Sequence, residues 1–343
     1  MNRFLSNFTP VLFWVMLHLL LLLPVHSHGS PETSFVRSTG KNFVLNGRLL
    51  HVNGFNSYWL MWVASDTDQR HKVTSAFKEA ADHGLNVART WAFNDGNGYH
   101  ALQTSPGVYD EQVFQRIMTR NNSLNGVVYK DDPTIFAWEL INEPRCQIDP
   151  SGRTVQRWVK EMASYVKSID SNHLLEVGME GFYGDSVPIR KQFNPNGLEF
   201  GTDFITINQL PGIDFATVHA YPDSWLAGSD DKVQLLFLKK WMKVHIKDAT
   251  KVLKKPILFA EFGKSYKDPG YNISERNKFY KTVYENIYKA AKTGKVGGGG
   301  LFWQLVAEGM ESLADGYEIV LSQNPSTAAL VSFQSRRLSA LDL

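Results

Sequence analysis

Two carboxylates follow strand-like apolar runs at distant points of the chain. Glu143 stands in the phrase Trp138–Pro144 (WELINEP), and Glu261 stands in Phe259–Gly263 (FAEFG). In an α/β barrel, the C-terminal ends of the parallel strands meet at one face, and the loops that begin there build the active site. A pair of carboxylates at that face can cleave a glycosidic bond, with one group as the acid and the other as the nucleophile or base. The pair therefore predicts chemistry on a sugar linkage.

The elements that must position this pair alternate along the chain as βα units around a parallel sheet do. Seven segments have the length and apolar character of strands: 49–55, 86–92, 134–141, 174–179, 215–219, 256–260 and 300–305. Four amphipathic stretches predict helices: 73–83, 155–169, 233–252 and 275–291. A hairpin-like pair over 35–45 is expected at the bottom of the barrel. The predicted fold class is α/β, of the (β/α)8 TIM-barrel type.

The number of strands falls short of that type. A closed barrel of this kind has eight strands, and the sequence offers seven. Between the second and third of them, only Gly126–Tyr129 has strand character. Turn formers and Lys130–Pro133 flank this piece, so we interpret it as the end of a helix and its turn. The sequence therefore predicts a barrel wall with one strand missing before Glu143.

The composition is that of a globular protein. The 343 residues include 36 basic and 34 acidic side chains, giving a net charge of +2, and 43% are hydrophobic. A charge so close to neutral provides no basic surface for nucleic acid, so no nucleic-acid partner is expected. No cluster of His, Cys and Asp has the spacing of a metal site, so no metal and no cofactor are expected.

The N-terminal segment has the composition of a secretory signal peptide. Arg3 precedes the nearly continuous apolar run Val11–Leu23, and small residues in Pro24–Ser27 suit cleavage. The apolar run is too short for a comfortable membrane span. We expect a signal peptide over 1–28, a single domain over 29–343 and no membrane association after cleavage.

A secreted chain with one cysteine has no internal disulfide. Cys146 has no histidine near it in the sequence to activate it, so we expect a partly buried, unreactive thiol. Two sequons, at Asn121 and Asn272, are candidate sites for surface glycans.

Two further patterns have structural interpretations. The glycine run 297–300 is expected to lead flexibly into the last strand. Along the helix 233–252, Trp241, Val244 and Val252 are expected to face inwards. The lysines of this region then form a solvated face, with a patch for acidic wall polysaccharide as the alternative: Lys239, Lys240, Lys243, Lys247, Lys251, Lys254 and Lys255.

Several phrases together resemble a known family. Asn142–Pro144, Val218–Pro222, Ala260–Gly263 and Phe302–Gln304 occur in the order seen in clan A retaining glycosidases, and as a set they resemble glycoside hydrolase family 5. Three more phrases, at 56–61, 87–93 and 129–139, are similar to the plant endo-β-1,4-mannanases of that family. The similarity runs from about residue 35 to the C-terminus, apart from one break.

The resemblance implies a role for each matching residue. Glu143 matches the general acid/base and Glu261 the nucleophile. The supporting residues would be Arg89 and Tyr221, which hydrogen-bond the nucleophile, Asn142 on the sugar 2-hydroxyl, His219 near the acid/base, Trp303 under the sugar at the cleavage point, and Trp59 at a neighbouring sugar subsite. Each has a structural alternative, because a buried arginine, histidine or tryptophan also serves as an ion-pair partner or as core packing.

The implied activity is that of a secreted enzyme of the plant cell wall. It would hydrolyse internal β-1,4-mannosidic linkages of mannan, galactomannan and glucomannan with retention, and mannan-type polysaccharide would be its partner. Two alternatives stay open. One is a catalytically inactive or misfolded relative that at most binds polysaccharide, and the other is a β-glucan hydrolase of the same mechanism.

The break in the resemblance lies near residues 115–116. In the family, the acid/base and the nucleophile end strands four and seven, whereas here they end the third and sixth strands. Family sequence worth roughly two βα spacings, including the third strand and adjoining helices, has no counterpart in the chain. Because strand number, tilt and shear are coupled, the loss must open the wall or reclose it at a smaller diameter. We hypothesise that the chain is a shortened product of a gene of this family.

Overall fold

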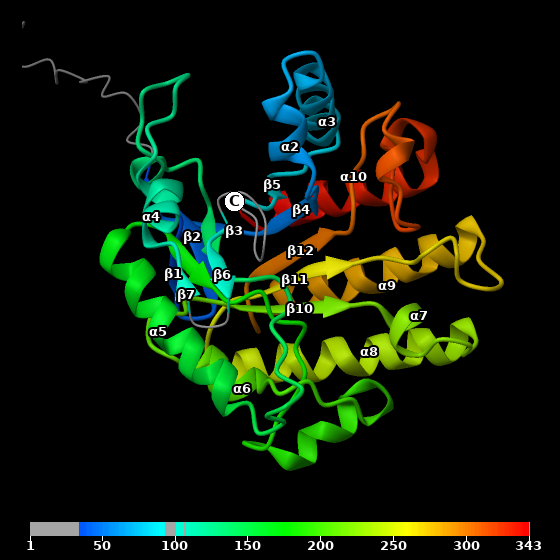
Figure 1. Ribbon diagram of the computed structural model, residues 1–343. Helices are drawn as coiled ribbons and strands as arrows, with labels where there is room; N and C mark the ends of the chain where they lie inside the picture. Colours follow the sequence, from blue (N-terminus) through cyan, green and yellow to red (C-terminus); the bar gives the residue numbers. More distant parts are fainter. Residues whose placement is uncertain (1–33, 93–100, 106–107, 343) are drawn as a thin grey trace, which may run out of the picture. The chain divides into compact units, whose positions relative to one another are not determined.

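The computed structural model describes residues 34–92, 101–105 and 108–342 (Figure 1). The chain divides into the units Met1–Ser34 and Phe35–Leu343, and the second holds all the described strands and helices. The predicted signal peptide over 1–28 lies outside the described residues.

Seven parallel strands form the central wall. They are β4 (Val52–Asn56), β5 (Val87–Arg89), β8 (Ala137–Glu139), β9 (Leu174–Glu176), β10 (Ala216–Ala220), β11 (Ile257–Phe262) and β12 (Gly298–Phe302). Five of them make one sheet in the order β10-β11-β12-β4-β5, while β8 and β9 make a separate parallel pair. Each lies in or overlaps a segment that the sequence predicts as a strand. The barrel-type α/β fold with seven wall strands is therefore confirmed.

The wall is open between β5 and β8. Within the described residues, no backbone hydrogen bond joins these two strands. All six of their residues are only half-buried, whereas every residue of the other five wall strands is buried. Between β9 and β10, by contrast, single backbone bonds close the wall, such as Asp214 N–H to Leu175 O at 2.8 Å. The missing third strand thus leaves an opening at the predicted place.

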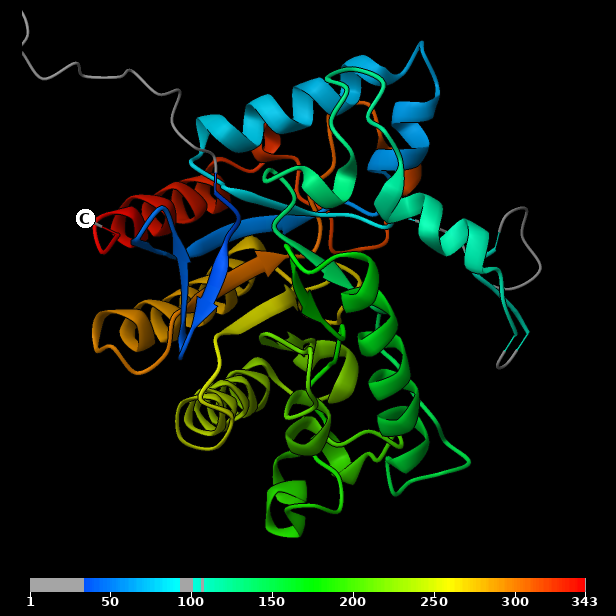
Figure 2. The ribbon, with the colours of Figure 1, turned by 90° about the vertical axis from the view of Figure 1, so that its left-hand side faces the viewer.

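The four predicted helices are all present. They are α3 (Arg70–Asp82), α5 (Arg153–Ile169), α8 (Asp231–Asp248) and α9 (Ile273–Lys292). Figure 2 shows helices packed around the strands. Four further helices were not predicted: α2 (Leu60–Ser65), α6 (Phe204–Asn208), α7 (Pro222–Trp225) and α10 (Pro325–Ser339). Most of these are short, and short helices carry too few turns for a clear apolar period.

Helix α8 continues into a π-helical turn, Ala249–Leu253. Trp241 and Val244 are buried as expected, but the expectation for Val252 is wrong, because this side chain is 43% exposed. The π-helical turn changes the residue period and rotates Val252 out of the buried face. Lys255, which follows the turn, donates to the carbonyls of Asn208 and Ile213 at 2.6 and 2.7 Å, so it does not belong to the solvated lysine face.

One helix crosses the predicted break. Helix α4 (Glu111–Thr119) runs without interruption through residues 115–116, and Asp110 caps it by accepting from Val113 N–H at 3.1 Å. The prediction that Gly126–Tyr129 ends a helix is wrong. The helix ends at Thr119, and an isolated antiparallel bridge from Asn121 to Val128 forms the turn that follows. That turn leads into η1 (Tyr129–Asp131) and then to β8.

Two small antiparallel sheets complete the strands. β1 (Arg37–Thr39), β2 (Asn42–Leu45) and β3 (Arg48–Leu50) form three strands where the sequence predicted a pair. Phe43 of this sheet is fully buried in a cluster with Val52, Phe215, Leu258 and other wall residues, so the sheet closes one end of the barrel interior. β6 (Gln103–Ser105) and β7 (Val108–Tyr109) make a hairpin that the sequence did not predict.

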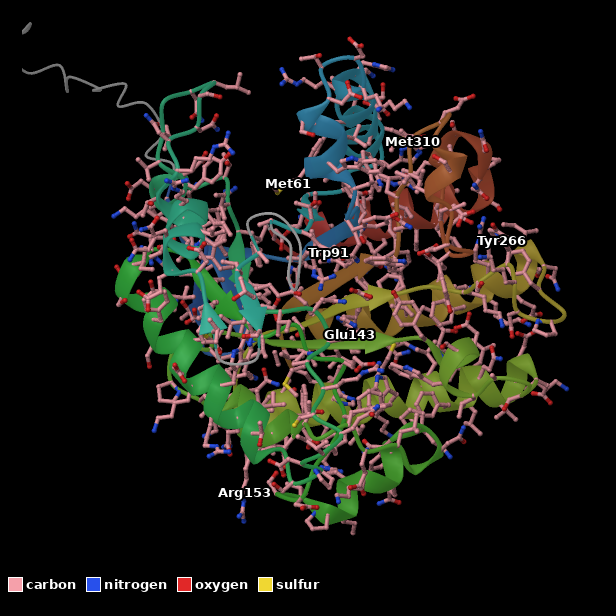
Figure 3. All side chains as sticks on the ribbon, viewed as in Figure 1. Met61, Trp91, Glu143, Arg153, Tyr266 and Met310 are labelled. Carbon is pink, nitrogen blue, oxygen red and sulfur yellow. The ribbon has the colours of Figure 1, made fainter. Side chains whose placement is uncertain are left out.

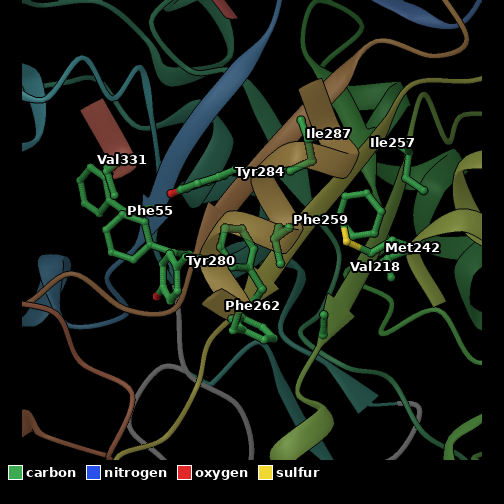
Figure 4. Close-up of a cluster of buried hydrophobic side chains, with 14 of the residues drawn as sticks. Phe55, Val218, Met242, Ile257, Phe259, Phe262, Tyr280, Tyr284, Ile287 and Val331 are labelled. Carbon is green, nitrogen blue, oxygen red and sulfur yellow. The ribbon is translucent and has the colours of Figure 1, made fainter. Parts of the chain in front are cut away.

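The core between β11, β12 and α9 is aromatic. Phe259, Phe262, Tyr280, Tyr284 and Ile287 pack together there (Figure 4). This packing fixes the strand that carries Glu261, because β11 is buried along its whole length.

Three of the four glycines of the run, Gly298–Gly300, are part of strand β12 and do not form a flexible segment before it. The strand begins at Gly298, two residues earlier than predicted. A Cβ atom on Gly298 would lie 1.8 Å from the carbonyl oxygen of Ile257, and one on Gly299 would lie 1.8 Å from that of Val52. Neighbouring backbones therefore approach so closely that no side chain fits, which explains the glycines.

Candidate active site

Both carboxylates meet at one histidine. Glu143 follows β8, His219 lies in β10 and Glu261 lies in β11. Nδ1 of His219 is 2.7 Å from Oε1 of Glu143 and 3.6 Å from Oε2 of Glu261. One ligand atom of each residue lies within 4.8 Å of those of the other two. Figure 3 shows Glu143 beside the C-terminal end of β10.

The backbone at Glu143 adopts an uncommon conformation. Its φ angle is +52°, in the left-handed region that a residue with a side chain seldom adopts. The Glu143 N–H donates to Gly178 O at 2.8 Å, which ties this turn to the segment after β9. Such backbone strain is common at functional sites, where the surrounding structure holds it.

Two donors hold the Glu261 carboxylate. Nη1 of Arg89 donates to Oε1 at 2.6 Å, and the Tyr221 hydroxyl donates to Oε2 at 2.8 Å. Burial and the Glu261 charge raise the pKa of Tyr221 well above its ordinary value, so this hydroxyl keeps its proton. Both contacts stabilise the negative charge on Glu261.

Arg89 serves more than one partner. Its guanidinium also donates to Oδ1 of Asn142 at 2.8 Å and to Oδ1 of Asn56 at 2.7 Å. Both oxygens of Glu139 accept from it, at 2.5 Å each. Glu139 is a site residue that the sequence reasoning missed. The sequence does contain a sign of it. An acidic residue within the apolar run that ends at Ile141 is expected to be buried, and a buried acid needs a charged partner.

The contact between Glu143 and His219 shifts their pKa values in opposite directions. Burial would raise the pKa of Glu143, but the hydrogen bond and charge of His219, with Arg145 and Arg89, outweigh it and hold the pKa below the ordinary value. Burial would lower the pKa of His219, but the charges of Glu261 and Glu143 raise it. A carboxyl group that acts as a general acid needs a raised pKa, which is the opposite of the direction found at Glu143 in the free site.

Three aromatic side chains that follow the C-terminal ends of β4, β5 and β12 lie together. The rings of Trp303 and Tyr58 are stacked, with centroids 6.1 Å apart and an angle of 11° between them. Trp91 is 45% exposed and lies 5.5 Å from Tyr58, ring centre to ring centre. The indole N–H of Trp303 donates to Oδ2 of Asp315 at 2.6 Å, which fixes the orientation of this ring.

The assignment of Trp59 to a sugar subsite is wrong. The side chain is fully buried, and its indole N–H donates to Leu305 O at 3.0 Å. It packs in the core beneath α2, where no sugar reaches it. A tryptophan beside a strand end has the same sequence signature in both situations, so the sequence could not tell them apart.

The remaining candidates lie as follows. Cys146 is free and half-buried. Asn121 and Asn272 are both exposed, and Asn272 also caps α9 by accepting from Glu275 N–H at 3.1 Å. Their glycosylation stays a prediction.

The cluster of Glu143, His219 and Glu261 has the donor types of a cation site. The sequence shows no such spacing, because the three residues lie far apart along the chain. The Arg89 guanidinium already balances the charge of Glu261, and Nδ1 of His219 is engaged with Glu143. These contacts suit a pair of organic catalytic groups better than a metal.

None of the helices in the described part of the chain is long and apolar enough to cross a membrane.

Parallel strands alternating with helices, and two carboxylates that meet at the C-terminal ends of the strands, define the chain as a glycoside hydrolase of the α/β-barrel type. A family model described as "GH family 5 beta-mannosidase-like" matches residues 112–315. The chain belongs to this family.

Curated plant proteins are close in sequence. Mannan endo-1,4-beta-mannosidase 1 of Oryza sativa subsp. japonica is 47% identical over 398 residues, covering 95% of this chain and 92% of the rice protein. Mannan endo-1,4-beta-mannosidase 7 of Arabidopsis thaliana is 47% identical over 376 residues, covering 91% of this chain and 87% of that protein.

Solved structures of mannanases share the fold. The endo-beta-1,4-mannanase of Thermotoga petrophila has a TM-score of 0.69 at 25% identity, covering 85% of this chain and 78% of that chain. The endo-1,4-beta-mannanase of Rhizomucor miehei has a TM-score of 0.69 at 26% identity, covering 90% and 100%.

The length of the alignment with the rice protein is consistent with the absence of an internal segment from this chain. The match to the rice protein spans 398 positions, but 95% of this 343-residue chain is about 326 residues, so about 70 positions face no residue here. The family-model match begins at residue 112, beside the predicted break.

Proposed function

We propose that this protein is a secreted endo-β-1,4-mannanase that hydrolyses internal linkages of mannan, galactomannan and glucomannan with retention. The observation that carries the proposal is the approach of Glu143 and Glu261 to the same atom of His219, within 4.8 Å of one another. Retaining glycosidases hold their carboxyl groups about 5–5.5 Å apart, whereas inverting ones leave about 6.5–9.5 Å for a water molecule.

The geometry supports a role for each residue. Glu261, held by Arg89 and Tyr221, attacks the anomeric carbon while Glu143 protonates the leaving oxygen. Glu143 then takes a proton from the water that releases the sugar. Asn142 uses its oxygen on Arg89, which leaves its amide N–H groups for the sugar 2-hydroxyl.

Trp303 offers its ring as a platform for the sugar at the cleavage point. The ring is half-buried and fixed by Asp315. A fixed aromatic face suits a sugar, because C–H groups on one side of the ring of a mannose unit can pack against it.

Two alternatives have their own support. The opening between β5 and β8 favours an inactive relative, since a 1 Å shift of a catalytic group can lower the rate about 10²-fold. A β-glucan hydrolase would use the same two carboxylates. The intact set of contacts around Glu261 and the named activities of the plant relatives favour the mannanase.

An assay of the purified protein on galactomannan and on barley β-glucan separates the three. We expect activity on galactomannan that disappears in Glu261→Ala. Activity on β-glucan alone would establish the glucan hydrolase, and a cooperatively folded protein without activity would establish the inactive relative. Proton NMR of the first product tests the mechanism, because retention gives the β-anomer first.

Extracellular localisation follows from the predicted signal peptide. Expression with the native N-terminus should place the protein in the medium, with a new N-terminus near Gly29. Mass spectrometry before and after glycan removal would test the sequons at Asn121 and Asn272. Retention of the protein inside the cell would contradict the proposal.

A further inference from the structure

The strand that carries Arg89 is supported on one side only. β5 pairs with β4 through Val87, Ala88 and Arg89, and its other edge faces the opening. Arg89 is the last residue of this strand. The sheet therefore does not fix the guanidinium from the side of β8.

Glu139 reaches Arg89 across the opening. It is the last residue of β8, and its two oxygens accept from Nε and Nη2 of Arg89 at 2.5 Å each. The remaining nitrogen, Nη1, donates to Glu261 at 2.6 Å. A two-point contact of this kind fixes the plane of a guanidinium as well as its place. The guanidinium thus spans from β8 to β11.

A second buried acid supports Glu139 from behind. The Glu176 side chain is buried, and its Oε2 accepts from Gly178 N–H at 2.5 Å and from the Thr217 hydroxyl at 3.0 Å. Glu176 is the register partner of Glu139 in the parallel strands β9 and β8, which places the two carboxyl groups side by side and lets them share a hydrogen bond. Two carboxyl groups share a hydrogen bond only if one of them carries a proton.

The environment decides which of the two acids is neutral. Burial and the charge of Glu139 raise the pKa of Glu176 well above its ordinary value. Burial would also raise the pKa of Glu139, but the charge and hydrogen bonds of Arg89 outweigh it and lower this pKa. Glu176 is therefore the donor, and Glu139 is the anion that faces Arg89.

We propose that Glu139, held by a hydrogen bond from Glu176, is the positioning residue that fixes Arg89 on Glu261 in place of the missing third strand. The proposal rests on the proposed function, in which Glu261 is the nucleophile. The contact between Glu139 and Arg89 then gives β5 the support that a paired strand would give.

Removal of the Glu139 charge has opposite effects on the pH profile if Glu139 positions Arg89 and if it only weakens the effect of the Arg89 charge. If Arg89 stays in place without Glu139, its whole charge acts on Glu261, and the acidic limb of kcat/KM moves to lower pH. If Arg89 loses its place, the nucleophile loses its cation, and the acidic limb moves to higher pH. The charged and titratable groups that face this site are Arg89, Glu139, Glu143, Arg145, Glu176, His219, Tyr221 and Glu261.

The test is the pH profile of Glu139→Gln on galactomannan. We expect kcat to fall about 10²-fold, as for a displacement of about 1 Å, with KM changed less than threefold and the acidic limb moved to higher pH. A kcat within threefold of the wild type together with an acidic limb at lower pH would overturn the proposal.

Glu176 provides a rescue by a conservative variant. In Glu176→Gln, the amide can donate to Glu139 while its oxygen accepts from Gly178 and Thr217. In Glu176→Leu, these bonds are lost. We expect the kcat of Glu176→Gln to be at least tenfold higher than the kcat of Glu176→Leu. Equal losses of kcat in the two variants would contradict the role of Glu176.

Asp248→Asn is the matched control for loss of a buried carboxylate. Asp248 is buried and pairs with Arg190 at 2.7 Å, outside the carboxylate site. It should lower the melting temperature without moving the acidic limb. A shift of the limb equal to that of Glu139→Gln would show a general effect of charge loss and overturn the proposal.

A measurement without substrate keeps the two proposals distinct. Nitrogen-15 NMR follows the exchange of the Arg89 Nε–H with solvent in the unliganded protein. We expect exchange at least tenfold faster in Glu139→Gln than in the wild type. An inactive wild type with this change would refute the proposed function alone, and unchanged exchange in an active enzyme would refute the positioning role alone.

Discussion

Nδ1 of His219 lies 2.7 Å from Oε1 of Glu143, and the His219 side chain is fully buried. This contact couples the charge of the histidine to the group that we propose as the acid. It also makes the stability of the fold depend on the charge of His219, because the raised pKa of this residue reflects favourable interactions with Glu143 and Glu261.

The pH dependence of stability tests this coupling. A histidine whose folded pKa is raised adds stability that is complete below its unfolded pKa, about 6.5, and is lost as the pH rises through the folded pKa. The stability difference between wild type and His219→Gln should therefore be largest near pH 5 and shrink towards pH 9. Melting temperatures of both proteins across that range provide the measurement. A difference that stays constant with pH would show that His219 is neutral in the fold.

Azide should distinguish the two catalytic carboxylates. Removal of a general acid costs about 10²–10⁴-fold, and less for a substrate with a good leaving group. Glu143→Ala should therefore keep more activity on an aryl β-mannoside than on mannan. Azide should restore turnover and give the β-mannosyl azide, because it attacks the intermediate formed with Glu261.

The nucleophile variant should give the other product. In Glu261→Ala, azide takes the place of the carboxylate on the opposite face and gives the α-mannosyl azide. NMR of the products identifies the anomers. The same anomer from both variants would show that the roles of Glu143 and Glu261 are assigned wrongly.

Asp315 should affect substrate affinity more than turnover. Its carboxylate accepts from the Trp303 indole N–H at 2.6 Å, and loss of a hydrogen bond to a charged group costs about 1.5–3 kcal/mol. Part of that free energy should be lost from substrate binding. Asp315→Ala should therefore raise KM about 3–10-fold with a smaller change in kcat. Asp185→Ala is the control, because Asp185 pairs with Lys191 through a side chain that is 60% exposed. An unchanged KM for Asp315→Ala would show that Trp303 does not need this anchor.

The sequence predicted the wall better than the contacts inside it. All seven wall strands and their deficit followed from apolar runs, because buried parallel strands are continuously hydrophobic. The pair of Glu143 and Glu261 followed from strand ends. Glu139 and Glu176 did not, because their link exists only after two strands pair and bring both carboxyl groups together.

The wrong predictions have local causes. Trp59 and Trp303 both lie beside strand ends, but the direction of each side chain depends on the turn that follows. The prediction for Val252 assumes an ordinary α-helical period, but this residue lies in a π-helical turn, in which the period differs. The sequence alone predicts a flexible segment at the glycines of β12, because the close approach of Ile257 and Val52 is a tertiary feature.

Restoring the missing segment should relieve the dependence on Glu139. A chimera that receives the corresponding segment of about 70 residues from the rice relative at residues 115–116 would supply a strand between β5 and β8. We expect a melting temperature at least about 5 °C higher, since about 1 kcal/mol corresponds to about 2–4 °C in a domain of this size. The amides of Arg89 and Glu139 should also exchange more slowly, because a paired strand protects them.

Glu139→Gln should lower the kcat of the chimera at least tenfold less than it lowers the kcat of the present chain. An equal cost in both proteins would mean that Glu139 holds Arg89 whether or not the third strand is present.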